Sequence, residues 1–309
     1  MARVSAPKIS MNLAINYSRQ AATLYETGQI ALDYFKCPAW EDLIAEARAI
    51  LPTYVHFPLR VGRGVVINTE KKAEADFDHI EKLLKMSDTP CVNIHFSPFD
   101  TDYPDVAYDS LASADIDKVV DFSIKAIEQL VKRFGADKIL VENVPSVKQT
   151  HMLCALYPDV ISRVIDETNT TLLFDISHAR LSAHRLGMNE YQYIRGLPLK
   201  QMQEMHVTGI ARVDEFVLER LEEKGLTDTI FHKLAGELVD HVPFTPLDWD
   251  ITAWAFEQIH SSAWRSPWVV AFEYGGVGGV FEAMSDSLKI AEQVPRLYRL
   301  VKNQHLMPY

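Results

Sequence analysis

Eight short segments of β-branched and aromatic residues alternate along this chain with segments that have the apolar spacing of helices. Such short apolar runs are typical of strands buried on both faces of a parallel sheet. The predicted strands are Met11–Tyr17, Ile30–Phe35, Thr53–Leu59, Cys91–Ser97, Lys138–Val144, Thr171–Ser177, Met205–Thr208 and Trp268–Tyr274. Eight strand–helix units within 309 residues predict an α/β fold, a single (β/α)8 TIM barrel. A doubly wound sheet shows the same alternation, but no Gly-x-Gly-x-x-Gly follows the first strand.

Each predicted strand is followed by a predicted helix, and these helices lie at residues 18–27, 39–50, 71–86, 115–134, 148–167, 189–194, 247–259 and, after the last strand, 280–300. One connection, residues 209–246, is long for a loop of this fold and contains charged helical stretches at 213–224 and 229–238. An excursion on the rim of a barrel predicts either a lid or specificity element, or the contact of a homodimer. No linker-like stretch interrupts the chain, so residues 1–309 are expected to form one domain.

Six of the strands carry a metal-ligand type of residue near the carboxyl end: His56, His95, Glu142, Asp175, His206 and Glu273. In a barrel these strand ends converge on one face, so the side chains are expected to point into one mouth. A lone polar group in an apolar strand is costly unless something pairs with it. Three buried carboxylates would also repel one another and become protonated. Bound cations would resolve both problems.

Three further residues are candidate ligands: His178, three residues after Asp175, and the adjacent pair Asp240 and His241, whose side chains need not converge. Imidazole and carboxylate ligands without thiolate suit iron, zinc or manganese. We therefore expect two or three divalent ions, bridged by a carboxylate such as Glu142. Taken singly, each residue also has an ordinary structural role: Glu142 could pair with a lysine or arginine, and Asp175 could cap the next turn.

Candidate substrate contacts lie beside these ligands. Lys36 and Arg60 follow the second and third strands, where a cation could hold an anionic group, and Asn16 and Asn143 could donate hydrogen bonds. A net charge of −11 argues against an extended surface for nucleic acid or an anionic membrane. Three cysteines are too few for a disulfide framework. No run approaches the ~20 apolar residues of a spanning helix, and residues 1–10 lack the apolar core of a secretory signal. A cytoplasmic location is expected.

The order of these residues resembles the xylose-isomerase-like superfamily of metal-dependent barrels, which includes sugar isomerases, epimerases and AP endonucleases. The series His56, His95, Glu142, Asp175, His178, His206 and Glu273 is similar to the trinuclear site of the endonuclease branch. That branch also has an Asp-x-His, for which Asp240-His241 is an imperfect substitute.

Within the superfamily, the chain is more similar to the multinuclear non-haem iron-dependent oxidases of the methanobactin-biosynthesis type. The similarity lies in residues 141–146, in 172–175 with 181–183, and in 197–198 leading to 205–209. The chain departs from that family at Ser177-His178, where Asn-Asn is usual, and at residues 57–60, where a Gly-rich stretch is usual. The resemblance implies two or three irons and the oxidation of cysteine-containing peptides, often with a partner protein.

Several functions are consistent with this pattern. The leading hypothesis is an iron-dependent oxidase that acts on a peptide or small molecule. The alternative is a sugar or sugar-phosphate isomerase or epimerase, in which Glu142 and Glu273 act as acid and base. An AP endonuclease ranks lower, because the chain is acidic and has no basic cluster in its loops. A barrel that only stores metal is the non-enzymatic alternative.

Overall fold

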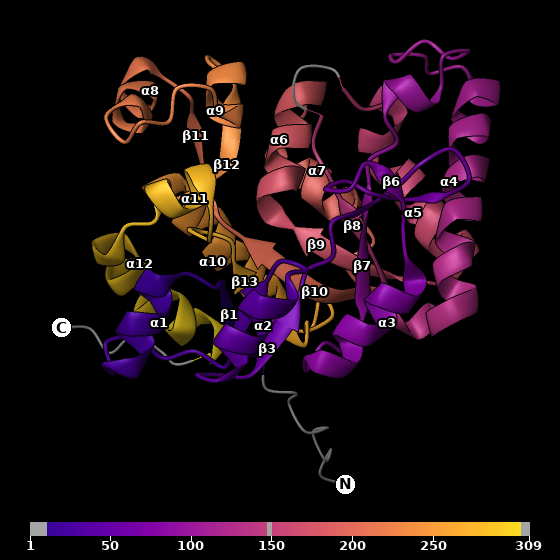
Figure 1. Cartoon of the computed structure of the whole chain (residues 1–309). Coiled ribbons are helices and arrows are strands. Elements are labelled where there is room, and N and C mark those ends of the chain that lie inside the picture. The colour runs from indigo at the N-terminus through magenta and orange to yellow at the C-terminus, as the bar shows by residue number, and fades with distance from the viewer. Residues whose placement is uncertain (1–10, 147–149, 304–309) are drawn as a thin grey trace, which may run out of the picture.

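Eight parallel strands form the centre of the molecule, and helices surround them (Figure 1). The computed structural model describes residues 11–146 and 150–303, so the expected start of a helix at 148 and the first ten residues lie outside the described part. Neighbouring strands follow the order β3 (Thr53–Val55), β2 (Tyr34–Cys37), β1 (Asn12–Asn16), β13 (Val269–Phe272), β10 (Met202–Val207), β9 (Thr171–Asp175), β8 (Ile139–Asn143) and β7 (Val92–Phe96). This confirms the predicted α/β barrel fold.

The third strand of the barrel is split into two. β4 (Leu59–Val61) pairs in parallel with β7, at the opposite end of the strand order from β3, yet only residues 56–58 separate β3 from β4. The predicted strand Thr53–Leu59 is therefore interrupted, and Pro58, which has no N–H to donate, lies in the interruption.

A side chain replaces the missing strand pairing at this interruption. The backbone N–H of Phe57 donates to Oδ1 of Asn93 at 2.7 Å, and Nδ2 of Asn93 donates to the carbonyl of Phe57 at 3.1 Å. On the other side, the N–H of His56 donates to the carbonyl of Cys37 in β2. Because Asn93 belongs to β7, its amide closes the ring of strands between β2 and β7.

The helices lie mainly where the sequence predicts them: α1 (Arg19–Glu26), α2 (Glu41–Arg48), α3 (Phe77–Met86), α4 (Ser113–Phe134), α5 (Pro158–Thr168), α7 (Glu190–Gly196), α10 (Pro246–His260), α11 (Gly279–Met284) and α12 (Ser287–Val301). The helix expected at 148–167 is α-helical only from Pro158, after a 3-10 turn at Leu153–Leu156. Three further differences are as follows. The helix expected from residue 71 starts only after a hairpin of β5 (Val66–Asn68) and β6 (Ala73–Glu74), where Asp76 caps α3. The helix expected at 280–300 is two helices, since Asp286 caps a new one. Finally, α6 (Ile176–Leu186) was not predicted.

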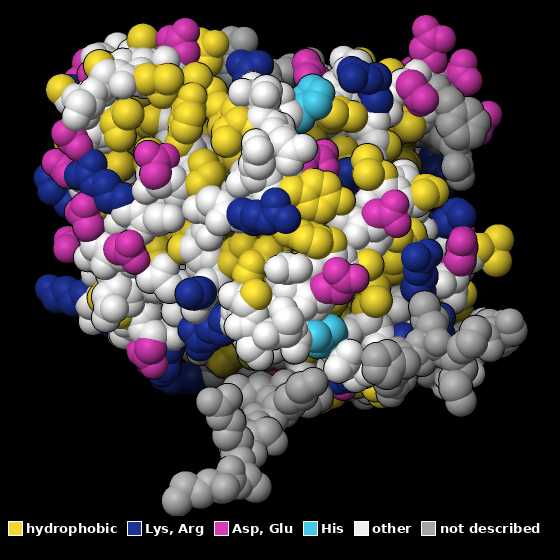
Figure 2. Space-filling view, turned by 180° about the vertical axis from the view of Figure 1, so that it is seen from behind, with side chains coloured by type: hydrophobic (Ala, Val, Ile, Leu, Met, Phe, Trp, Pro, Cys, Tyr) yellow, Lys and Arg dark blue, Asp and Glu magenta, His cyan; other side chains and the backbone are white. Residues whose placement is uncertain are grey.

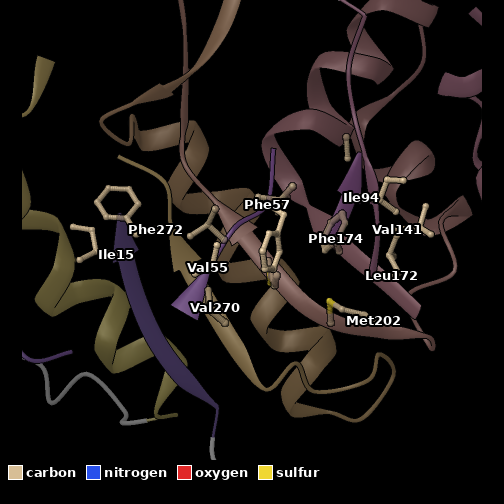
Figure 3. Close-up of a cluster of buried hydrophobic side chains, with 14 of the residues drawn as sticks. Ile15, Val55, Phe57, Ile94, Val141, Leu172, Phe174, Met202, Val270 and Phe272 are labelled. Carbon is tan, nitrogen blue, oxygen red and sulfur yellow. The ribbon is translucent and has the colours of Figure 1, made fainter. Parts of the chain in front are cut away.

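Alternation along the strands separates two layers of apolar side chains. Residues such as Ile15, Ile94, Phe174 and Phe272 belong to a large cluster between the strands and the helices (Figure 3). Residues of the other parity fill the inside of the barrel, where Tyr54 and Trp268 meet with ring centroids 5.2 Å apart. Each large side chain buried in this way contributes about 2 kcal/mol to folding. This inner layer forms the floor beneath the polar strand ends.

Residues 209–246 form a small unit at one end of the barrel, visible beside α11 in Figure 1. Its elements are β11 (Gly209–Arg212), α8 (Glu215–Glu222), α9 (Ile230–Lys233) and β12 (Leu238–Val242), with β11 and β12 antiparallel. A side chain on Gly209 would lie 2.1 Å from the carbonyl oxygen of Pro243, so only glycine allows this close return of the chain. In the described residues, no helix is long and apolar enough to cross a membrane.

Candidate metal centre

Six imidazole and carboxylate side chains face one another at the carboxyl ends of the strands. The shortest approaches are His56 Nε2 to Glu142 Oε2 at 3.2 Å, His95 Nε2 to the same oxygen at 3.4 Å, and His206 Nδ1 to Glu273 Oε1 at 3.1 Å. His206 also lies 4.0 Å from Asp175 Oδ2. Glu142, Asp175, His206 and Glu273 are all buried. The barrel thus brings together all six strand-end residues that the sequence singles out.

His178 and the pair Asp240 and His241 join this cluster from the rim. His178 lies in the first turn of α6, with Nε2 2.9 Å from Asp240 Oδ2 and Nδ1 3.4 Å from Glu142 Oε1. The pair Asp240 and His241 lies in β12, where His241 has a left-handed φ of 59°. This backbone conformation is unusual for a residue other than glycine, and it interrupts the alternation of a regular strand. Both neighbours therefore face the centre.

Asp175 caps a helix with one carboxylate oxygen and presents the other oxygen as a possible metal ligand. Its Oδ1 atom caps α6 by accepting a hydrogen bond from the N–H of His178 at 2.8 Å, as the ordinary interpretation of an aspartate after a strand predicts. Its Oδ2 atom is buried and has no hydrogen-bond partner among the described residues. One oxygen is therefore left for another ligand.

Three histidines are held by backbone carbonyls through Nδ1. A carbonyl only accepts, so Nδ1 carries a hydrogen, and Nε2 is the ring atom that faces the cluster. Metal-binding histidines are commonly oriented in this way. The pairs are His95 with Leu59 at 2.7 Å, His178 with Asn143 at 2.9 Å and His241 with Glu273 at 2.8 Å.

His206 is oriented by a carboxylate that the sequence analysis did not identify. Its Nε2 atom lies 2.9 Å from Oε1 of Glu204, which leaves Nδ1 directed at the acidic cluster. Glu204 precedes His206 by two residues in β10, so the alternation of strand side chains could have placed it on the same face. Burial raises the pKa of Glu204 to about 7.

Buried polar atoms that lack hydrogen-bond partners indicate whether a metal ion fits at this cluster. Among the described residues, Asp175 Oδ2, His206 Nδ1 and Asp240 Oδ2 have no hydrogen-bond partner, although His178 Nε2 lies near the last of these. Lone pairs of nitrogen and oxygen that face one another are unfavourable unless a cation lies between them. Three groups have donor atoms within 4.8 Å of one another: His56–Glu142–His206, Glu142–Asp175–His178 and Asp175–His206–Glu273. The donor set fits more than one divalent ion.

Burial and neighbouring charges together set the ionisation of these groups. Burial lowers the pKa of His56 and of His206 well below the usual value, so both rings are neutral and able to act as ligands. Burial raises the pKa of Asp175 to about 6. For Glu142, burial favours the neutral form, but His95 and His178 beside it outweigh burial and lower the pKa. For His178, burial opposes the charged ring, but the carboxylates of Asp175, Asp240 and Glu142 outweigh it and raise the pKa well above its usual value.

The four residues that were expected to contact the substrate lie in different places relative to the cluster. Lys36 is buried and forms an ion pair with Glu273. Asn16 lines the cavity and donates to the carbonyl of Gly275 at 3.2 Å. The side chain of Asn143 binds both backbone groups of Asp175, accepting from its N–H and donating to its carbonyl, so it positions a candidate ligand.

Arg60 differs from the expectation. Its guanidinium forms an ion pair with Asp102, donates to the carbonyl of Val61 and lies 4.0 Å above the ring of Phe99. It is not among the described residues that line the cavity. The guanidinium charge that was expected to hold an anionic substrate group is therefore neutralised by Asp102.

A cavity of about 600 Å³ leads from the cluster to the surface. His56, His95, Glu142, His178, His241 and Glu273 line its inner part, and many of its other lining residues are apolar: Tyr17, Pro38, Trp40, Phe57, Pro58, Val277 and Phe281. Trp40 and Phe281 are 43% and 37% exposed, so they lie at the rim. Gly275 and Gly276 have positive φ values and carry the chain past the opening.

Comparison with solved structures defines the class of the barrel. The fold is similar to that of a xylose isomerase domain-containing protein from Salmonella typhimurium LT2, with a TM-score of 0.53 and 12% identity over 94% of this chain and 97% of that one. It is also similar to a 3-keto-D-glucoside 4-epimerase from E. coli, with a TM-score of 0.50 and 14% identity over 93% and 99% of the two chains. The fold of the chain is therefore that of a xylose-isomerase-like TIM barrel.

The family is defined by sequence. A family model described as RiPP precursor modification enzyme MbnB/TglH/ChrH matches residues 35–263, and the chain belongs to this family. This confirms the resemblance on which the sequence analysis relied. A UPF0276 protein from Paraburkholderia phytofirmans (strain DSM 17436 / LMG 22146 / PsJN) is 27% identical over 139 residues, which are 42% of this chain and 44% of that protein. The match thus spans less than half the length of that relative.

Proposed function

We propose that this chain is an iron-dependent enzyme that oxidises a cysteine-containing peptide, with two or three divalent ions at the strand ends. The main support is the overlap of the three candidate ligand groups, in which Glu142, Asp175 and His206 each belong to two groups. Shared ligands bring ions close together, as in sites where neighbouring metals act on one substrate. Membership of a family of peptide-modifying enzymes supports the substrate class.

The residues that would hold the ions are His56, His95, Glu142, Asp175, His178, His206, Asp240, His241 and Glu273. Bound iron would supply redox chemistry with dioxygen as the oxidant and an affinity for a cysteine thiolate. The chain itself orients the imidazoles through Glu204 and the three carbonyls. Its apolar cavity walls exclude water from the bound side chain.

The cavity favours a peptide over a sugar. A sugar has a hydroxyl on most carbons, and a site that selects it supplies many hydrogen-bonding groups. Here the path from the cluster to the surface is lined largely by aromatic, proline and valine side chains. These surfaces suit the apolar parts of a peptide that extends outward from a cysteine held at the centre.

The charge of the surface does not favour a nucleic acid. On the face shown in Figure 2, lysine and arginine side chains are interspersed with acidic ones. Lys36, a lysine that lines the cavity, is buried in an ion pair with Glu273. An abasic-site endonuclease needs a basic surface along the phosphate backbone, and the net charge of −11 acts against one.

The experiment is anaerobic loading of the purified protein with ferrous iron, followed by metal analysis and oxygen electrode measurements with a panel of cysteine-containing peptides. We expect at least two irons per chain and oxygen uptake that depends on the cysteine, with the matched serine peptides inert. The Glu142→Gln variant should lose both. One equivalent of manganese or zinc, no oxygen uptake and incorporation of solvent deuterium into a keto-sugar would instead identify an epimerase.

A further inference from the structure

One carboxylate lies at the mouth of the cavity, apart from the candidate metal ligands. Glu70, in the turn between β5 and β6, is exposed and lines the cavity. Besides the candidate metal ligands, the other charged residue among the described lining residues is Lys36, which is buried in its ion pair with Glu273. Lys71 and Lys72 follow Glu70 along the chain, but neither is among the described residues that line the cavity. The mouth therefore carries a negative charge that no described lining residue balances.

Trp40 holds this carboxylate in place. Its indole Nε1, just before α2, donates to the two carboxylate oxygens of Glu70 at 3.2 and 3.3 Å. The far edge of the ring approaches the glycine-rich segment after β13, where a Cβ on Gly278 would lie 3.8 Å from Cη2 of the indole. One indole hydrogen uses only part of the capacity of the carboxylate, because its two oxygens have about four lone-pair sites. Glu70 is therefore fixed beside an aromatic ring and can still accept hydrogen bonds.

A carboxylate beside an exposed indole suits a positively charged side chain. An ammonium or guanidinium group can form an ion pair with the carboxylate and lie over the aromatic ring, so that both contacts favour the same cation. We infer that Glu70 selects peptides that carry a lysine or arginine close to the cysteine, with Trp40 as the second contact. A carboxylate of the peptide would be repelled from the same place. This inference rests on the proposed function, because it adds one feature to the peptide that the cavity takes.

The size of the cavity sets how close the basic residue must be to the cysteine. Glu70 and the candidate ligands His56, His95 and Glu142 line the same cavity of about 600 Å³. A volume of this size holds a ligand the size of a drug molecule rather than a long peptide. When the cysteine lies at the inner end, the residue at the mouth is therefore one of its near neighbours in the peptide sequence, before or after it.

The test measures the binding of peptides that differ at a single position. Each peptide has a central cysteine, blocked ends, a dye on its last residue, and lysine, glutamine or glutamate at one of the four positions nearest the cysteine. Fluorescence anisotropy with the iron-loaded protein under argon gives the dissociation constants, so that no oxidation is needed. At one or more of these positions, we expect the lysine peptide to bind about fivefold more tightly than the glutamine peptide, and the glutamate peptide to bind less tightly than either.

Three variants connect this preference to Glu70. Glu70→Gln should bind the lysine and glutamine peptides alike, and Glu70→Lys should prefer the glutamate peptide. The matched control is Glu74→Lys, which makes the same change of charge in exposed β6, at a residue that does not line the cavity. This control should keep the preference for lysine. Both positions are exposed, so circular dichroism should show the fold of the natural protein in each variant.

The outcomes separate this inference from the proposed function. Equal binding of the lysine and glutamine peptides at every position, or a lysine preference that persists in Glu70→Lys, would overturn the inference. So would a preference confined to a further peptide whose single cation is a free amino terminus next to the cysteine, because the inferred group is a side chain. Binding that depends on Glu70, without any oxygen uptake, would overturn the proposed oxidation alone. No binding of any peptide would overturn both.

Discussion

Nε2 of His206 lies 2.9 Å from Oε1 of Glu204, and both side chains are buried at the base of the candidate metal centre. The carboxylate fixes the ring so that Nδ1, which has no hydrogen-bond partner among the described residues, faces Glu142, Asp175 and Glu273. An anion behind the ring also makes the imidazole a stronger ligand.

Replacing this carboxylate should weaken metal binding without removing a ligand. Glu204→Gln keeps the shape of the side chain but loses its charge, so we expect a dissociation constant for cobalt(II) at least about tenfold higher. Competition with a coloured chelator measures it. Glu292→Gln, on the exposed surface of α12, is the matched control and should bind as the natural protein does. Equal affinity in the two variants would show that Glu204 does not orient a ligand.

The closure of the barrel through Asn93 predicts a large effect on stability. Asn93→Ala removes two hydrogen bonds to the backbone of Phe57 and leaves buried backbone groups without partners, so we expect a loss of about 3 kcal/mol in the free energy of unfolding. Urea denaturation of the metal-free protein measures it. Asn68→Ala, which removes one exposed hydrogen bond to the N–H of Lys71, should lose less than about 1 kcal/mol. Similar losses in both variants would contradict this role of Asn93.

Removal of metal should lower the melting temperature in a way that depends on Asp175. At a free metal concentration of about 100 times the dissociation constant, binding stabilises the fold by about 2.7 kcal/mol. Asp175→Asn keeps a side chain that can cap α6 but loses the charge of a ligand. We expect the chelator-treated variant to melt close to the chelator-treated natural protein and to gain much less on metal addition. An equal gain in melting temperature in both proteins would show that Asp175 is not a metal ligand.

The aromatic rim predicts an effect on peptide recognition that leaves metal binding unchanged. Trp40 and Phe281 line the cavity near the surface, so Trp40→Ala and Phe281→Ala should each raise KM for a cysteine-containing peptide about tenfold. Steady-state oxygen uptake measures KM and kcat separately. Leu288→Ala, a change at an exposed apolar residue that does not line the cavity, is the control. If all three variants have the KM of the natural protein, the rim does not contact the substrate.

Much of the fold could be predicted from sequence because the strands of a barrel are short, apolar and regularly spaced. The convergence of His95, Glu142 and His206 follows from the same regularity, since strand ends in this fold meet on one face. Glu204 could have been predicted as well, because it precedes His206 by two residues and side chains two residues apart in a strand lie on the same face.

Other features depend on contacts between distant parts of the chain, which local patterns do not contain. The split of the third strand depends on Asn93, 36 residues after Phe57. The pairing of Arg60 with Asp102 spans 42 residues. The direction of Lys36 depends on Glu273, which comes from the far end of the chain. For long flexible side chains, the type of residue indicates a charge but not its partner.

The central claim is that cations hold the strand-end imidazoles and carboxylates together. Anomalous diffraction at the iron absorption edge, from crystals loaded anaerobically with ferrous iron, tests it most directly. We expect at least two adjacent peaks, both within coordination distance of Glu142. No peak within coordination distance of Glu142, in protein that retains the fold, would contradict the account.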